Sequence, residues 1–206
     1  MPSQIGFERG AWVAALVLGS LVACKSDGGR EAPTDHARAM TQAFAADLQA
    51  TLLAAIEAGG PVHAIDVCKH DAPMISAKHS KAGWTLVRTS TRVRNPQNAP
   101  SPWQQAVLDD WQAQLASGAV TDPATLEWSA IEGSGAEAEL RYMRAIPLGG
   151  VCLGCHGPAE QLDPAVIAAL ADHYPDDQAT GFRVGDLRGA FVVTGPAAQP
   201  PAPVGR

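Results

Sequence analysis

Apolar residues in the first part of the chain recur at helical intervals. They stand four residues apart, so they share one face of a helix that begins near Asp35: Met40, Phe44, Leu48, Leu52 and Ile56. The pair Gly59-Gly60 ends this helix. A second helix is expected after it: Pro61 can open it, Pro73 bends or restarts it, and Gly83 ends it.

The middle of the chain predicts a strand followed by a helix. Residues 84–96 are rich in β-branched side chains and close on a proline, which is typical of a strand. Ser101 then begins a helix, with Pro102 at its first position and Gln104 completing a capping box. Gly118 ends it. Five residues form its apolar face: Trp103, Val107, Leu108, Trp111 and Leu115.

The rest of the chain predicts a hairpin, a short helix and a last strand. Two strand-like segments, residues 125–132 and 138–148, flank a Gly-Ser-Gly turn. Asp163 and Pro164 cap a short helix, and residues 189–193 form the last strand. The expected fold class is α+β: N-terminal helices, then an antiparallel sheet of about four or five strands with helices on one face.

The composition fits one soluble globular domain with short appendages. The chain has 206 residues, of which 46% are hydrophobic, so it is long enough to bury a core. Its net charge is −6, and it has no basic stripe that could neutralise phosphates. We therefore expect no nucleic-acid partner. The sequence shows no internal repeat, and no second domain or output module is expected after Gly195.

The N-terminus predicts export from the cytoplasm. Arg9 precedes an apolar run over residues 11–24 that has the length of a signal-peptide core. The run closes on Leu-Val-Ala-Cys, which resembles the lipobox of bacterial lipoproteins. That resemblance implies a signal peptide of residues 1–23 and a lipid on the sulfur of Cys24. An uncleaved anchor, or a plain signal with a chance cysteine, is the alternative.

The segments that flank the domain are polar or Pro-rich. Residues 24–36 have the composition of a flexible tether, and residues 196–206 predict a disordered tail. The expected location is the bacterial periplasm or cell envelope, where the lipid anchors the protein to a membrane.

One motif carries cofactor chemistry. It is C-x-x-C-H, made of Cys152, Cys155 and His156, the attachment signature of c-type haem. The two thiols can reach the two vinyl groups on one porphyrin edge, and the adjacent imidazole then ligates the iron. A thioredoxin-like pair should open a helix, but Gly157-Pro158 interrupts at once. A zinc site needs four ligands, and no second pair is present. Chance is the third alternative. The predicted export favours the haem interpretation, because c-type haem is attached outside the cytoplasm. We therefore expect one covalent haem c.

Cys68 has no disulfide partner if Cys24 carries a lipid and the motif thiols bind haem. It is either an inert buried thiol or a ligand at the open position on the iron. Seven residues are candidates for that position: Cys68, Met74, Met143, His63, His70, His79 and His173. From spacing alone, Met or His ranks ahead of Cys, because those are the usual second ligands of cytochromes c.

Four landmarks, taken in order, resemble a known family. They are AIDVCKHDAP, VRTSTRVRNPQNAPSPW, PLGGVCLGCHG and YPDDQATGFRVGDLRGAFVV. They are similar to single-haem c-type proteins with a PAS-like fold, first catalogued as a domain of unknown function. The resemblance implies a PAS-like haem c domain over residues 37–195, with haem in its pocket. It also implies His156 as the proximal iron ligand and Cys68, unusually, as the second axial ligand.

Several residues are candidates for contacts around the haem. Arg88, Arg92 and Arg94 alternate along the expected strand, so they share a face that could clamp the propionates, or they form a solvated strand face. The segment RNPQNAPSPW either lines the pocket, with Trp103 near the ring, or is a plain turn. Five further residues are interpreted as loop-geometry residues: Tyr174, Asp177, Thr180, Gly185 and Asp186.

The function expected from these features is that of a membrane-tethered periplasmic monohaem c-type cytochrome with an electron-transfer or redox role. The alternative is a haem-based redox or gas sensor for NO or CO that acts through a separate partner. A peroxidase-like enzyme would need an open distal site with acid–base residues. The sequence shows no clear set of such residues, so no enzyme activity is expected. The partner is an unidentified redox or signalling protein.

Overall fold

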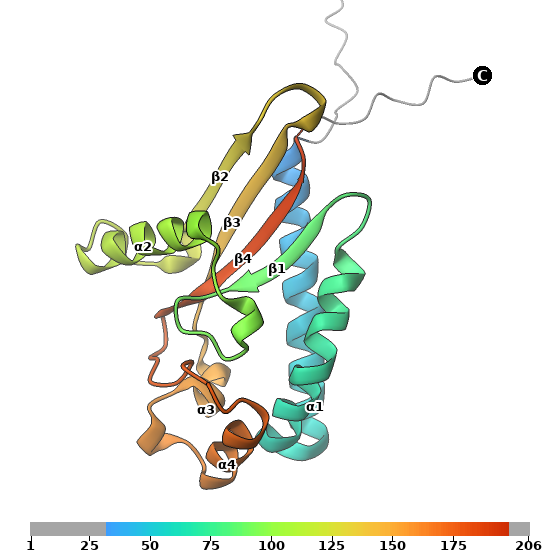
Figure 1. Ribbon diagram of the computed structural model, residues 1–206. Coiled ribbons are helices and arrows are strands. Elements are labelled where there is room, and N and C mark those ends of the chain that lie inside the picture. Colours follow the sequence, from blue (N-terminus) through green and yellow to red (C-terminus); the bar gives the residue numbers. More distant parts are fainter. Residues whose placement is uncertain (1–31, 198–206) are drawn as a thin grey trace, which may run out of the picture. The chain divides into compact units, whose positions relative to one another are not determined.

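The first element of the fold is a long helical segment, α1, that folds back on itself (Figure 1). In a computed structural model that describes residues 32–197, α1 spans Pro33–His79. Gly59 and Gly60 interrupt it with non-helical backbone angles. Two helices separated at this glycine pair were predicted from the sequence, and they are confirmed. We refer to them as the first and second limbs of α1.

Ion pairs join the two limbs of α1. The carboxylate of Asp47 on the first limb lies 2.7 Å from Lys78 Nζ and 2.8 Å from His79 Nε2 on the second. The end of the second limb therefore meets the middle of the first, and the second limb runs back along the first in the opposite direction (Figure 1). Hydrogen bonds from Lys78 and His79 lower the pKa of the Asp47 carboxyl.

Both ends of α1 differ from the prediction. The helix begins at Pro33, so the last residues of the predicted tether are helical; Pro33 suits a first turn, and Asp35 is favoured there by the helix dipole. Pro73 does not restart the second limb, because the backbone angles on both sides of it are helical. This limb ends at His79, before the predicted end at Gly83. There Ser80 turns the chain towards the sheet, because its hydroxyl accepts the Leu86 N–H at 2.9 Å.

The described residues form one four-stranded sheet in which every neighbouring pair is antiparallel. Its order is β1-β4-β3-β2. The strand bounds are β1 Thr85–Thr89, β2 Glu127–Glu132, β3 Glu139–Pro147 and β4 Leu187–Pro196. The predicted hairpin is confirmed as β2 and β3. The last strand is also confirmed, and it is longer than expected.

The strand predicted over residues 84–96 is wrong beyond Thr89. Its chain leaves the sheet at Ser90, whose hydroxyl donates to the Arg188 carbonyl at 2.8 Å and accepts the Arg92 N–H at 3.1 Å. These side-chain bonds replace the ladder and turn the backbone. The chain then passes through irregular structure into a short 3₁₀-helix, η1, at Pro96–Asn98.

Helices cover both faces of the sheet, not one face as the sequence predicted (Figure 1). The helix α2, Pro102–Ala116, was predicted with its apolar face and its Gln104 cap, and both are confirmed. It packs on the face that contains Met143, whereas the first limb of α1 packs on the face that contains Tyr142. Consecutive strand residues point to opposite faces, so burial of both requires two covers.

The remaining elements are helices, and most of them lie between the hairpin and β4. The predicted helix after Asp163 is confirmed as α4, Pro164–His173, and the Asp163 side chain accepts the Ala165 N–H at 2.7 Å. The single-turn helix α3 spans Leu153–His156. Four further 3₁₀-helices complete the inventory: η2 Pro123–Thr125, η3 Gly135–Glu137, η4 Gly150–Cys152 and η5 Ala159–Gln161.

Residues 1–31 and 198–206 lie outside the described part of the chain. The predicted signal peptide, Cys24 and nearly all of the predicted tail fall there. Within residues 32–197, no helix has the length and apolar character that crossing a membrane requires.

The break in α1 predicts a cost for a side chain at Gly60. Its angles, φ 76° and ψ −176°, belong to a region that is essentially restricted to glycine. We expect Gly60→Ala to lower the free energy of unfolding by about 1–3 kcal/mol, measured by urea denaturation. Gly150→Ala is the matched control, because Gly150 has open space around it and no positive φ. Equal midpoints for the two variants would contradict the prediction.

Candidate functional site

A cavity of about 510 Å³ lies where several parts of the chain meet: both limbs of α1, β1 with the loop after it, the end of β3 with the segment around α3, and the start of β4. Its lining includes three cysteines and one histidine: Cys68, Cys152, Cys155 and His156. We call it the thiol cavity. Its volume lies in the range of small-molecule and cofactor sites.

Cys68 enters the thiol cavity from the second limb of α1 and is partly buried. Burial raises the pKa of its thiol, and the charges of Arg88 and Arg94 partly oppose that effect. Burial also raises the pKa of Cys155 across the cavity, and Cys68 is among the groups that act on it. The lone cysteine of the sequence therefore lies near the thiols of the motif.

None of the other candidates for the second ligand lines the thiol cavity. Met143 is fully buried in the core beneath α2, and Met74 is 62% exposed. His79 is held by Asp47, and His70 lies beside Asp66 on the helix surface. The two remaining histidines, His63 and His173, are also absent from the lining. Of the seven candidates, Cys68 alone lines the thiol cavity, whereas spacing alone ranked Met and His ahead of it.

One ring nitrogen of His156, Nδ1, is hydrogen-bonded, and the other, Nε2, has no hydrogen-bond partner among the described residues. Its Nδ1 lies 2.6 Å from the Ala179 carbonyl oxygen. Burial, followed by the charges of Arg94 and Arg188, lowers the pKa of His156 to about 2. The imidazole is therefore neutral, so Nδ1–H donates to Ala179 and Nε2 keeps its lone pair. This is the tautomer that a metal-binding histidine requires.

The backbone around His156 is tied to the loop before β4. The Phe182 N–H donates to the His156 carbonyl at 2.9 Å, and the Gly181 N–H donates to the Gly157 carbonyl at 2.7 Å. The Phe182 ring also meets the imidazole edge-on, with centroids 6.4 Å apart. The ring of His156 is thus fixed by a segment that follows it in the sequence.

Two of the three predicted arginines line the thiol cavity, and one does not. Arg88 and Arg94 are part of the lining. Arg92 lies outside it: its guanidinium stands 4.1 Å from the centre of the Phe182 ring, and its Nε donates to the Gln178 carbonyl. The prediction that the three arginines share one strand face is wrong. The strand ends at Thr89, so residues beyond it do not alternate between the two faces of the sheet.

The position of Trp103 also corrects a prediction. Residues 95–98 of the Pro-rich segment contribute to the lining through Asn95, Gln97 and Asn98, but Trp103 does not. It stacks on Trp128 with ring centroids 5.6 Å apart. Its indole is therefore part of the packing between α2 and the sheet, not of the thiol cavity.

Arg188 and Tyr174 line the thiol cavity although the sequence did not mark them as site residues. Burial, followed by the charges of Arg94 and Arg88, lowers the pKa of Arg188 to about 10. Lys69 Nζ lies 5.9 Å from the centre of the Tyr174 ring. A charged residue just before an apolar strand was the one sequence signal for Arg188. Tyr174 was interpreted as a loop-geometry residue.

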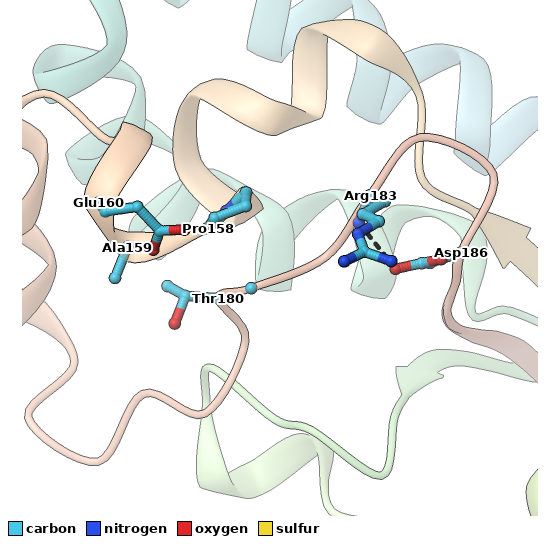
Figure 2. Close-up of a pocket in the computed structure, with 7 residues that line it drawn as sticks. Pro158, Ala159, Glu160, Thr180, Arg183 and Asp186 are labelled. Carbon is cyan, nitrogen blue, oxygen red and sulfur yellow. Dashed lines mark hydrogen bonds between the residues drawn. The ribbon is translucent and has the colours of Figure 1, made fainter.

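A second hollow, of about 410 Å³, lies beside the segment that follows the motif. Figure 2 shows its polar lining, where the Arg183 N–H donates to the Asp186 carboxylate at 2.7 Å. It contains neither thiol nor imidazole. Among residues 32–197, no group of three or more His, Cys, Asp or Glu side chains could hold a metal ion.

The fold and the thiol cavity define a small α+β protein with a C-x-x-C-H motif in the lining of an internal cavity. The chain belongs to the Tll0287-like family, whose model matches residues 29–196. It is similar to the crystal structure of the cyanobacterial heme-protein Tll0287, with 25% identity and a TM-score of 0.54. That match covers 82% of this chain and 98% of the other. No curated protein matches this chain.

The neutral His156 predicts a pH dependence of stability for the chain expressed without a cofactor. Its pKa is about 2 in the folded chain against an ordinary value of 6.5, so between these values the unfolded chain alone takes the proton. This contribution to stability is fully present above the unfolded pKa and is lost as the pH falls. In urea titrations, the wild-type midpoint should fall more between about pH 7.5 and about pH 5 than that of His156→Gln. Parallel curves would be the contrary result.

Proposed function

We propose that the chain binds one haem in the thiol cavity, attached covalently through Cys152 and Cys155. The observation that carries this proposal is the meeting of the C-x-x-C-H motif with one further soft ligand, Cys68, in the lining of a single cavity. The similarity to a solved heme-protein supports the same cofactor. We also propose that the sheet and its helices correspond to the PAS-like fold expected from the sequence.

The residues of the thiol cavity fit such a group. His156 offers a neutral Nε2 as the proximal ligand, and Cys68 offers a sulfur as the second axial ligand. The pKa of the Cys68 thiol is raised by burial, but binding to a metal ion favours the deprotonated sulfur. Both axial positions would therefore be filled by side chains of this chain.

Two arginines of the thiol cavity are suited to the propionates. The Arg88 side chain makes no hydrogen bond or ion pair with another described residue, and burial lowers its pKa. Arg188 Nε is buried without a hydrogen-bond partner among the described residues. Buried cations that lack a carboxylate are costly until an anion pairs with them. The pair Arg88 and Arg188 thus replaces the predicted set, because Arg92 lies outside the thiol cavity and Arg94 is paired with Asp177.

Filled axial positions favour a redox role over an enzyme activity. When bound, haem supplies one-electron exchange between ferric and ferrous iron. A peroxidase-like reaction would need an open iron position, and Cys68 occupies it in this proposal. We therefore infer an electron-transfer or redox role with a separate partner protein.

A redox or gas sensor is the second candidate. The observation that favours it is the position of Cys68 on the second limb of α1, which begins at the glycine break. Displacement of the thiolate by NO or CO would break the bond between Cys68 and the iron, and would free this limb from the cofactor. Such a sensor would pass the change to a separate partner.

The proposed setting is the bacterial cell envelope. Cys24 would carry the lipid that holds the chain at a membrane, and the export signal that precedes it would bring the domain to a compartment where c-type haem is attached. Both features lie outside the described residues and rest on the sequence.

Covalent attachment is tested by mass. The chain expressed with a cytochrome c maturation system should be heavier by one haem, and the colour should survive acid–acetone extraction. Cys152→Ala and Cys155→Ala each remove one thioether, so either variant should lower the covalent haem content. Trp103→Phe is the control, since Trp103 lies outside the thiol cavity. Complete extraction of haem from the matured wild type would sink the proposal.

Ligation by Cys68 is tested by EPR. The ferric wild type should be low-spin with the pattern of thiolate–imidazole ligation. Cys68→Ala should keep the covalent haem, make the iron five-coordinate or water-bound, raise the reduction potential and admit cyanide. His70→Ala is the matched control, because His70 lies two residues away on the outer surface of the helix. A wild-type EPR spectrum in Cys68→Ala would show that another residue is the ligand.

A further inference from the structure

A buried ion pair lies behind His156 and is not part of the ligand set. Arg94 and Asp177 meet at 3.0 Å between Arg94 Nη2 and Asp177 Oδ2, and a second bond joins Arg94 Nε to the same oxygen at 3.1 Å. The two side chains are only 13% and 10% exposed. The net gain in stability from such a pair is small, because desolvation offsets most of the attraction. Its position suggests a different role.

Asp177 fixes the turn that presents a carbonyl to His156. Its second oxygen, Oδ1, accepts the Ala179 N–H at 2.8 Å, an Asx-type turn. The Ala179 carbonyl then lies 2.6 Å from His156 Nδ1. Ala179 is fully buried, so this carbonyl has little freedom to find another partner.

Arg94 joins this turn to the attachment motif. Its Nη2 donates to the Cys155 carbonyl at 2.5 Å and reaches the Ala179 carbonyl at 3.4 Å. One guanidinium therefore bonds to the residue before His156, to the residue that accepts from His156, and to the carboxylate that sets the turn. The distance between these segments depends on a single planar group with a fixed fork of donors.

We propose that Arg94 and Asp177 act together as a positioning pair for His156, an inference that rests on the proposed function. They set the direction and strength of the Nδ1–H···O bond to Ala179. A stronger bond at Nδ1 makes Nε2 a better donor to iron, which is how groups behind a histidine ligand tune a metal. Arg94 is thus assigned to orienting the proximal ligand, and not to a propionate as the sequence predicted.

The test compares the reduction potential of the matured haem protein in three variants. Asp177→Ala removes both the ion pair and the Asx-type turn. Asp177→Asn keeps an oxygen that can accept the Ala179 N–H but loses the charge that holds Arg94. Asp176→Ala is the matched control, because Asp176 is an exposed aspartate one residue away. Mass spectrometry of each variant reports its covalent haem content separately.

We expect Asp177→Ala to shift the equilibrium between ferric and ferrous protein at least tenfold towards the ferrous form, a rise of about 59 mV for one electron. Asp177→Asn should show a smaller rise, and Asp176→Ala none. NMR of the ferrous protein distinguishes positioning from a pure charge effect: the His156 Nδ1–H should exchange with solvent at least tenfold faster in Asp177→Ala. An unchanged exchange rate would overturn the inference even if the potential moved.

The variants also separate this inference from the proposed function. If the wild type carries no covalent haem, or lacks imidazole ligation, the proposed function fails. If the wild type behaves as proposed but Asp177→Ala keeps its potential and its Nδ1–H exchange, the positioning pair fails alone. If Asp177→Ala does not mature, Asp177→Asn decides: wild-type potential and exchange in that variant overturn the inference.

Discussion

The packing of Ile65 against α4 is the contact on which the site depends. Ile65 lies one helical turn before Cys68, and it packs into a cluster with Leu162, Val166 and Leu170. Cys155 packs against the same cluster. Apolar contact between two distant parts of the chain therefore sets the distance between Cys68 and the C-x-x-C-H motif. Without this packing, Cys68 and the C-x-x-C-H motif would not face one cavity.

The second constraint is the positive charge of the thiol cavity. Arg88, Arg94 and Arg188 all contribute to its lining, but among the described residues the one ion pair that these arginines make is that between Arg94 and Asp177. Burial lowers the pKa of Arg188 and of Arg88, because an unpaired guanidinium is poorly solvated there. The pocket is thus better suited to an anionic group than to a neutral one of the same size.

The parts of the structure that follow from local rules could be predicted from the sequence. The limbs of α1, the hairpin and α4 depend on helical spacing, turn glycines and an aspartate cap, all of which act over a few residues. The C-x-x-C-H motif is local in the same sense. The end of β1 is not: Ser90 turns the chain by bonding to the Arg188 carbonyl, which is distant in sequence. Arg92 and Trp103 were misplaced because a tertiary contact ends that strand and because α2 packs on the second face of the sheet.

The thiol cavity is assembled from segments spread along nearly the whole described chain, and this has a consequence for the order of events in the cell. Cys68 emerges early, the motif much later, and Arg188 and the loop that holds His156 later still. Long-range contacts of this kind form slowly, because loop closure comes before the contacts that reward it. The thiols would therefore stay accessible until β4 pairs with β1 and β3. Closure of the cavity would then be a late step of folding, which follows once the last strand of the domain is in place.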